Sequence, residues 1–258
     1  MKSWIRWGAA LGCISSVVMG SVVMNAEQAL ALTQEQVIER LQPVPVFAIT
    51  NTEGVPLLGS VGEGEQAVSV ANVFISRGDA EAFLTQLRED NAQLASSVRI
   101  TPVSLAEIYE LATDESQSAQ AIRFAIVPTE EEVQGAVNLL QQQGQGEGFQ
   151  GVPLFYAEST DSEGGYLTVQ QGDRQVIPMY FDQEDLEALL TRVSESEPDL
   201  ASTMRVQVTS LEGVIQLMQE GDEPELNSIL LVPPKESIDF IRSLPNQQGR
   251  PNQPAPGN

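Results

Sequence analysis

The residues best suited to chemistry in this chain are carboxylates that gather where helices are expected to begin. One group is the run 130–132, which is Glu-Glu-Glu, and a second is formed by Asp182, Glu184 and Asp185. Paired carboxylates can serve as general acid and base. Negative charge in the first turn of a helix also interacts favourably with the helix dipole, by about 0.3–1 kcal/mol. Because no spacing sets two of these acids across a defined cleft, we interpret both groups as helix starts rather than catalytic pairs.

Two further motifs have weaker claims to a ligand. The loop 222–225 carries three acids, but it lacks the glycine and the spacing of a calcium loop. The glycines of segment 144–148 do not stand between a strand and a helix, as a dinucleotide-binding motif requires. We therefore interpret the first as a solvated loop and the second as part of a linker.

Histidine and cysteine, on which many enzyme mechanisms depend, are almost absent from this sequence. Histidine is absent, and the single cysteine, Cys13, lies close to the N-terminus. Thiolate nucleophiles, Ser-His-Asp relays, haem ligation through histidine and the usual zinc sites all depend on these residues. The sequence therefore predicts a protein that is not an enzyme and has no cofactor and no metal. A hydrolase that uses carboxylates alone is the enzymatic alternative that remains.

The N-terminal region has the pattern of a secretory leader. Lys2 and Arg6 precede an apolar run over residues 7–24, and a small-x-small cleavage site follows. This pattern predicts a signal peptide over residues 1–31, an exported mature chain and no membrane insertion after cleavage. An uncleaved membrane anchor is the alternative, which the glycines of the run weaken. A lipoprotein box at Cys13 would have too short an apolar stretch before it.

The exported chain is strongly acidic. Cleavage would remove Lys2, Arg6 and Glu27, so that the formal net charge of −23 becomes −24. Like charges repel over a Debye length of about 8 Å at physiological salt. Neither nucleic acid nor an anionic lipid surface is therefore expected as a partner.

The chain contains an internal duplication. The segment 94–99, LASSVR, returns as 200–205, LASTMR, at an offset of 106 positions. Solenoid repeats have periods of about 20–50 residues, so this period indicates two copies of one small domain. We place the copies at residues 32–143 and 151–244, related by a pseudo-twofold axis. A Gly- and Gln-rich linker, 144–150, joins them, and a disordered tail, 245–258, follows.

Each copy is expected to have the element order β-β-β-α-β-α-β-α, an α+β (mixed α/β) fold in which helices cover a mixed sheet. A turn over residues 51–54 places Gly54 where a positive φ is needed. The pairs Ser104 with Glu107 and Thr129 with Glu132 have the spacing of capping boxes. The expected strands are 44–50, 55–61, 68–76, 98–103 and 122–127 in the first copy, and 152–157, 166–170, 175–181, 204–208 and 229–232 in the second.

Two apolar segments, 151–156 and 176–181, are candidates for binding a partner. Each contains a proline, a residue that strands tolerate mainly at sheet edges and strand starts. Apolar side chains beside an open edge can receive an extended segment of another chain, whereas burial in the core is the alternative for the same residues. The predicted partner-binding residues are Val152, Leu154, Phe155, Tyr156, Ile177, Met179, Tyr180, Phe181, Phe47 and Phe74.

Several of these motifs together resemble the Tic22 family, soluble proteins of the chloroplast intermembrane space and their cyanobacterial relatives. The resemblance covers about residues 44–241, and the bacterial type of leader indicates a cyanobacterial member. The motifs that carry it are 44–47, VPVF; 73–76, VFIS, with Asp79; 151–155, GVPLF; 177–181, IPMYF, with Asp185; and 231–233, LVP.

The resemblance implies a pseudo-symmetric body with exposed hydrophobic pockets and no catalytic residues. It implies a chaperone-like role in protein transport between two membranes and in outer-membrane biogenesis, in the periplasm or the thylakoid lumen. The implied partners are unfolded precursor or outer-membrane proteins, and the outer-membrane barrel-assembly protein with its periplasmic domains. Two alternatives remain open: a periplasmic small-molecule-binding module, and a scaffold that binds folded translocon components.

Overall fold

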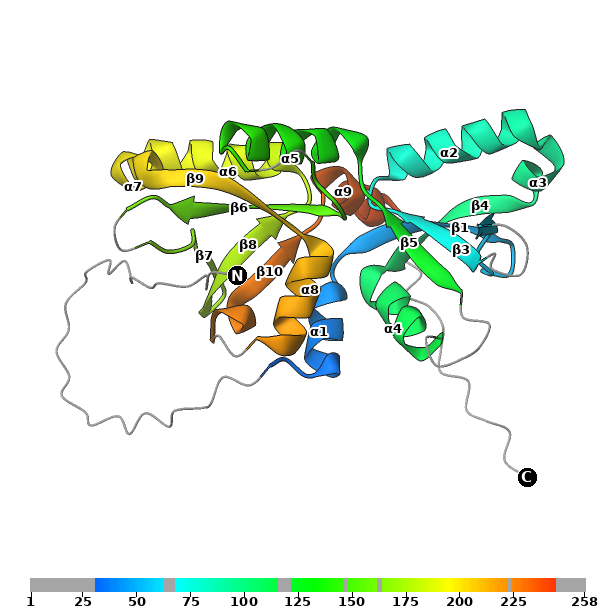
Figure 1. Ribbon diagram of the computed structural model, residues 1–258, viewed down its shortest axis with the longest axis horizontal. Coiled ribbons are helices and arrows are strands. Elements are labelled where there is room, and N and C mark those ends of the chain that lie inside the picture. Colours follow the sequence, from blue (N-terminus) through cyan, green and yellow to red (C-terminus); the bar gives the residue numbers. More distant parts are fainter. Residues whose placement is uncertain are drawn as a thin grey trace, which may run out of the picture.

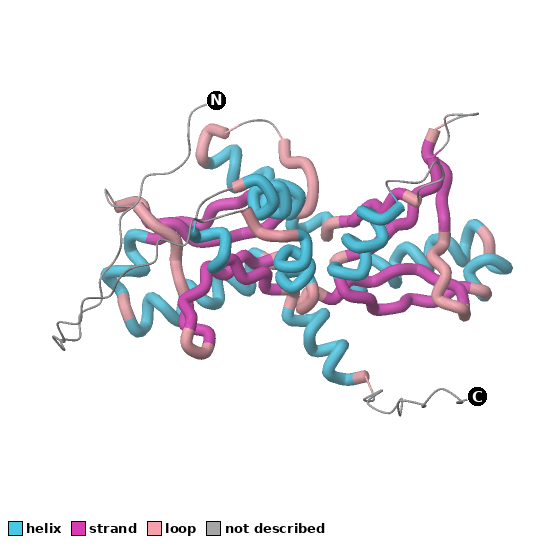
Figure 2. Tube along the Cα trace, turned by 90° about the horizontal axis from the view of Figure 1, so that it is seen from below, coloured by secondary structure: helices cyan, strands magenta, loops and turns pink. Residues whose placement is uncertain are grey.

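The protein folds into two five-stranded sheets that lie side by side along its long axis (Figure 1). The computed structural model describes residues 31–62, 68–115, 122–145, 148–161, 164–221 and 224–244. The predicted tail 245–258, and the predicted leader apart from Ala31, lie outside the described residues. Seen from below in Figure 2, two groups of strands flank helices near the centre of the molecule.

The first sheet is built from the N-terminal copy and has the order β2-β3-β1-β4, with β5 added in parallel to β3. Strand β1 is buried on both faces: Val46 and Ala48 point to one side, and Phe47 and Ile49 to the other. The elements of this part are α1 (Gln34–Leu41), β1 (Pro45–Asn51), β2 (Leu58–Val61), β3 (Val68–Phe74), α2 (Arg77–Asp90), α3 (Ala92–Ser96), β4 (Val98–Ser104), α4 (Leu105–Glu115), β5 (Arg123–Val127) and α5 (Glu130–Gln142).

The second sheet repeats this arrangement, with the order β10-β8-β6-β9 and β7 added to β8. As in the first sheet, the last strand runs parallel to its neighbour, because β10 pairs with β8 in parallel. The elements are β6 (Pro153–Ser159), β7 (Val169–Gln171), β8 (Arg174–Tyr180), α6 (Gln183–Ser196), α7 (Pro198–Thr203), β9 (Met204–Ser210), α8 (Leu211–Glu220), the 3-10 helix η2 (Pro224–Ser228), β10 (Ile229–Val232) and α9 (Lys235–Ser243).

The strand registers show that the two units have the same topology. Pro45 lies opposite Ser104 in the first sheet, and Pro153 lies opposite Ser210 in the second. The predicted mixed α/β fold with a repeated element order is therefore confirmed. The short helices α3 and α7, which turn the chain between a long helix and the next strand, were not predicted, and neither was α1.

The strands β6 and β8, which contain the two apolar segments, lie inside the second sheet, and not at its edges as predicted. The proline rule failed for identifiable reasons. Pro153 is the first residue of β6. Pro178 lies opposite Leu230 in the parallel pairing with β10, but outside the single Cα pair that joins β6 to β8, Phe155 with Tyr180. Neither proline therefore interrupts a hydrogen-bonded ladder between these strands.

Local signals place most turns and helix starts as expected. Gly54 has a φ of 88° in the turn after β1, where the Asn51 Oδ1 accepts from the backbone N–H of Glu53. Asp182 caps α6, with its carboxylate accepting from the Asp185 backbone N–H at 3.1 Å. The backbone N–H of Ser104 donates to the Glu107 carboxylate at 3.2 Å, as the capping box requires.

The second predicted capping box does not form, and its glutamate makes a contact between the copies instead. Thr129 makes no side-chain cap hydrogen bond. The Glu132 carboxylate accepts from the backbone N–H of Gln183, at the start of α6, at 3.0 Å. In the corresponding place of the other copy, Ser237 of α9 donates to the carbonyl of Ile75, at the end of the first sheet's β3 region.

These contacts arise because the last helix of each copy packs on the sheet of the other copy. Helix α5 follows the first copy but packs on the second sheet, where Ala136 joins Phe155 and Leu186 in one apolar cluster. Helix α9 follows the second copy but packs on the first sheet, where the rings of Phe240 and Phe47 lie 5.8 Å apart. Figure 1 shows both helices displaced toward the opposite sheet.

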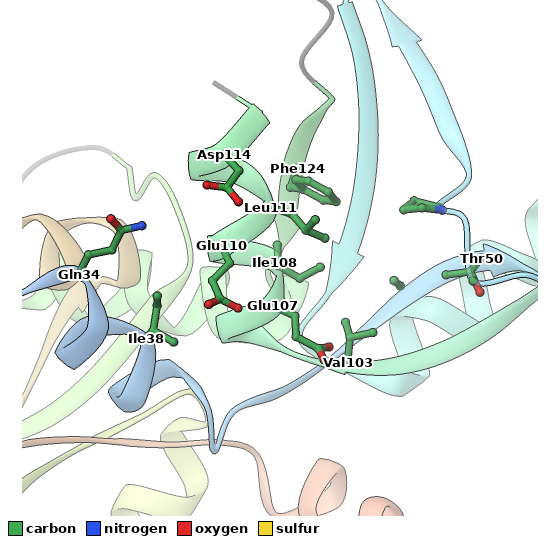
Figure 3. A pocket seen from close by; sticks show the side chains of 13 residues that line it. Gln34, Ile38, Thr50, Val103, Glu107, Ile108, Glu110, Leu111, Asp114 and Phe124 are labelled. Atoms are coloured by element: carbon green, nitrogen blue, oxygen red, sulfur yellow. The ribbon is translucent and has the colours of Figure 1, made fainter. Parts of the chain in front are cut away.

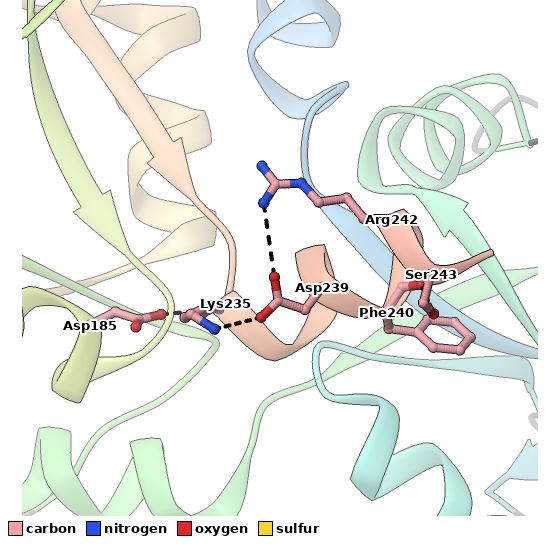
Figure 4. A network of polar contacts seen from close by, with 6 residues as sticks. All are labelled: Asp185, Lys235, Asp239, Phe240, Arg242 and Ser243. Atoms are coloured by element: carbon pink, nitrogen blue, oxygen red, sulfur yellow. Dashed lines mark hydrogen bonds and ion pairs between the residues drawn. The ribbon is translucent and has the colours of Figure 1, made fainter.

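Helix α9 is fixed at both ends of its path across the boundary (Figure 4). The Lys235 backbone N–H donates to the Asp185 carboxylate at 3.1 Å, and Lys235 also pairs with Asp239 on its own helix. Near the other end, the Arg77 guanidinium lies 4.1 Å from the centre of the Phe240 ring, a cation–π distance.

Helix α1 joins the copies on the opposite face of the molecule. Its Arg40 donates to the carbonyl of Asn227 at 2.6 Å, and the Leu32 N–H that precedes it donates to the carbonyl of Met218 at 2.8 Å. Val37 and Leu41 lie in a buried cluster that draws residues from both sheets. The two copies therefore share one hydrophobic core.

This shared core predicts that the protein unfolds in one transition and that α9 stabilises both copies. We expect Phe240→Ala to lower the free energy of unfolding by about 2 kcal/mol, less than a fully buried ring because Phe240 is half-buried. Urea denaturation followed by circular dichroism measures this loss. Glu236→Ala, an exposed change on the same helix, should have little effect. Two separate transitions, of which only one shifts, would contradict the prediction.

A second prediction concerns pH. Burial, together with the nearby carboxylates of Asp182, Glu131 and Glu184, raises the pKa of Glu132 from 4.5 to about 7, against the lowering effect of the Gln183 N–H. A raised native pKa means that this group's stabilisation is complete below about pH 4.5 and is lost as the pH rises through 7.

Glu132→Gln keeps a hydrogen-bond acceptor for Gln183 but removes the titration. The variant should match the wild type in stability near pH 4.5 and exceed it at pH 8, in urea denaturation at both pH values. The matched control is Glu130→Gln, which makes the same charge change at an exposed position. An equal effect of the two variants at pH 8 would show that general charge repulsion, and not Glu132, sets the pH dependence.

Candidate functional site

The ten predicted partner-binding residues lie in the core and do not form an exposed groove. Nine of them are buried, with exposed fractions between 0% and 7%, and Tyr180 is half-buried. Val152, Leu154, Tyr156, Ile177, Met179 and Phe181 belong to the shared central core, Phe155 and Tyr180 to the cluster under α5 and α6, and Phe47 and Phe74 to the cluster under α2 and α9.

The physical reason is the position of their strands. Since β1, β3, β6 and β8 are each flanked by other strands, and these ten side chains pack into the three apolar clusters, they are not free to receive a partner. Core packing, the alternative given above for these residues, accounts for their positions.

The first copy has a groove with an apolar lining (Figure 3). It has a volume of about 580 Å³, opens to solvent and lies between α1, α4 and the face of the first sheet. Its apolar lining is formed by Ile38, Ala48, Pro56, Val103, Ile108, Leu111 and Phe124. Thr50 also lines the groove. Its hydroxyl is hydrogen-bonded to that of Thr101 at 2.7 Å, so this polar group needs no partner from an occupant.

The groove exists because two small residues of the first copy replace two large residues of the second. The strand registers make Ala48 the counterpart of Tyr156, and the bridges of Thr50 to Pro56 and of Glu158 to Tyr166 make Pro56 the counterpart of Tyr166. The rings of Tyr156 and Tyr166 pack 5.7 Å apart at this position in the second copy, where Tyr156 is buried and Tyr166 is 40% exposed. Burial, the largest cause, raises the pKa of the Tyr156 hydroxyl.

One side of the groove is acidic. Glu107, Glu110 and Asp114 follow each other at helical spacing along α4 and line the groove, and all three are exposed (Figure 3). Leu111, on the same helix, is 44% exposed and also lines the groove. The site therefore combines an apolar floor with a negative rim.

A smaller cavity of about 370 Å³ adjoins the groove and shares Val103 and Glu107 with it. Ile238 and Ile241 of α9 line this cavity together with Pro45 and Pro102 of the first sheet. Because α9 belongs to the second copy, the apolar surface continues from the groove to the boundary between the copies.

The groove could have been found by comparing the duplicated positions. Aligning the repeats shows alanine at position 48 against tyrosine at 156, a volume difference at equivalent strand positions. That Ala48 faces an open side of the sheet could not be read in this way, because it depends on where α1 and α4 pack.

The described residues contain no group of three or more His, Cys, Asp or Glu side chains that is placed to hold a metal ion. Within that same part of the chain, every helix is too short or too polar to cross a membrane. Fold and site together define a duplicated two-sheet α/β protein with an open apolar groove.

Comparison with known proteins identifies the family. The model of the Tic22-like family matches residues 5–243, so the chain belongs to this family, which acts in protein transport. The chain is 27% identical over 207 residues to the protein TIC 22, chloroplastic, of Pisum sativum, covering 80% of this chain and 75% of that protein. The chloroplastic TIC 22 of Arabidopsis thaliana is also 27% identical, with 70% of its length covered.

Two solved structures share the fold. The Tic22 of Anabaena, described as a protein of protein transport, superposes with a TM-score of 0.73 and 30% identity over 83% of this chain and 99% of that one. Tic22 of Plasmodium falciparum superposes with a TM-score of 0.62 at 23% identity, over 80% of this chain and 95% of its own.

Because Phe155 is fully buried, we predict that changing it affects folding and not a binding surface. Phe155→Asp replaces a fully buried ring by a carboxylate with no partner, and we expect a loss of more than about 4 kcal/mol and of the native circular dichroism spectrum. Phe155→Leu should stay folded and keep any client binding. A folded Phe155→Asp variant that fails only in client binding would place this ring on a client surface instead.

Proposed function

We propose that this protein is a non-enzymatic, chaperone-like factor of protein transport that holds apolar segments of unfolded client proteins in the groove of its first copy. One observation carries the proposal: the first copy keeps an open apolar groove of about 580 Å³ at the position that two tyrosines fill in the second. Packing alone favours filling such a space, because apolar surface left in water costs about 25 cal/mol per Å². An open groove is therefore best explained by an occupant.

The shape of the groove favours a chain segment over a small molecule. Sites for small ligands usually bury most of the ligand surface, whereas this groove is open along the molecule and continues into the cavity beside α9. Val55 and Leu58, which are close in sequence to the groove residue Pro56, are also exposed apolar residues. A periplasmic small-molecule-binding module fits this geometry less well.

The family and the leader support a location and partners for this function. The proposed location is an exported compartment, periplasm or thylakoid lumen, on the strength of the leader pattern in residues 1–31. The proposed clients are unfolded precursor or outer-membrane proteins, with the barrel-assembly protein of the outer membrane as a further partner. Two relatives are named as chloroplastic, which fits a role at envelope membranes.

The test compares equivalent positions of the two copies. Leu111→Ser removes an exposed apolar contact from the groove, and Leu217→Ser makes the same change at the duplicate position, which is 47% exposed. We expect Leu111→Ser to weaken client binding about fivefold, since a partly covered leucine contributes about 1 kcal/mol. Suppression of aggregation of an unfolded outer-membrane barrel protein, without nucleotide, is the measurement, and Leu217→Ser should behave as the wild type.

A second variant tests the same site by filling the groove, whereas Leu111→Ser removes a side chain from it. Ala48→Tyr with Pro56→Tyr copies the ring pair of the second copy into the first, and should abolish suppression while keeping the circular dichroism spectrum. Suppression that survives in this folded variant would reject the groove as the client site. No suppression by the wild type would instead favour a scaffold that binds folded translocon components.

A further inference from the structure

The helix that borders the groove carries a like-charge pair where its duplicate carries a hydrogen bond. Glu110 and Asp114 lie one turn apart on α4, both exposed and both lining the groove (Figure 3). Their counterparts on α8 are Gln216 and Glu220, and there the Gln216 amide donates to the Glu220 carboxylate at 3.1 Å. Like charges at this spacing destabilise a helix, whereas a Gln–Glu pair stabilises it.

The local structure does not compensate for the acids of α4. Glu107 has a structural role, because it accepts from the Ser104 N–H at the start of the helix. Asp114 lies in the last turn, where the helix dipole favours positive charge, and that turn contains no basic residue. In the part of the chain that the structure describes, neither Glu110 nor Asp114 forms an ion pair, since the ion pairs there involve Arg77, Lys235 and Arg242.

The segments 63–67 and 116–121, which follow β2 and α4, contain no lysine and no arginine. Within the described residues no cation offsets this pair, so a positive group that binds at the rim would turn its cost into an attraction. Next to an apolar floor a charged pair is also less screened than in open water. An occupant that fits both the acidic rim and the apolar floor therefore combines positive charge with apolar groups.

We propose that the groove selects polypeptide segments in which lysine or arginine stands beside apolar side chains, and this inference rests on the proposed client-binding function. The apolar side chains of the segment contact Val103, Phe124 and the exposed Leu111, while its cationic groups reach Glu110 and Asp114 at the rim. A segment of the same apolar content with neutral or acidic residues binds more weakly.

The experiment uses three fluorescent peptides with one apolar pattern and with lysine, glutamine or glutamate at the same two positions. Fluorescence anisotropy with the wild-type protein should show the lysine peptide binding about tenfold more tightly than the glutamine peptide, and the glutamate peptide most weakly. The advantage of lysine should shrink in 0.5 M salt, because exposed charges are screened.

The variants assign the preference to the rim. Glu110→Gln with Asp114→Asn should weaken binding of the lysine peptide about fivefold and leave binding of the glutamine peptide unchanged. The control, Glu195→Gln with Glu220→Gln, makes the same net charge change at exposed positions on α6 and α8 and should leave both peptides unaffected. Glu110→Gln alone, which copies the arrangement of α8, should keep or slightly raise the melting temperature while it weakens lysine binding.

The outcomes separate this inference from the proposed function. Equal weakening in the rim and control variants would show that net charge alone attracts the peptide, and would overturn the inference. Unchanged lysine binding in the rim variant, with both peptides still weakened by Leu111→Ser, would also overturn it but leave the client groove intact. If none of the three peptides binds the wild type, the proposed function itself fails.

Discussion

The packing of each copy's last helix on the other copy's sheet is the constraint on which the rest of this structure depends. Without α9 the rings of Phe47 and Phe74 in the first sheet would lose part of their cover, and without α5 the second sheet would lose the cover over Phe155. Helix α1 and the shared central cluster close the opposite face of the same boundary. Neither copy therefore buries its own apolar surface completely, and we expect the two to fold as one unit.

One difference between the copies lies on the solvent side of the first sheet. Residues at the boundary, such as Glu132 and Ser237, contact the other copy and are fixed by that contact. The solvent side of α4 and the face of the first sheet beside it line the groove instead. There Ala48 and Pro56 leave the space that Tyr156 and Tyr166 fill in the second copy, and a groove results.

Charge in this protein has two different physical uses. Most acids of the described residues are exposed and spread over the surface, where their like charge disfavours association between molecules. Others have defined partners, as Asp182 has at the start of α6 and Asp185 at the start of α9. Asp79, the counterpart of Asp185, has a buried carboxylate oxygen without a hydrogen-bond partner in the described residues, so the duplication is not exact in its polar contacts.

The sequence by itself determined the local elements, the duplication and the family. Glycine at position 54 and the apolar run of β1 act over a few residues and predicted a turn and a strand correctly, while the repeated LAS motif indicated the duplication but not the short helices α3 and α7 that contain it. The tertiary structure decided which helix covers which sheet and which apolar residues reach solvent. Glu132 has the spacing of a capping box, yet it binds Gln183, 51 residues away. Phe155 reads as an edge residue, yet it lies under α5. Periodicity reports only which face of an element is apolar, whereas burial depends on which distant element packs on that face.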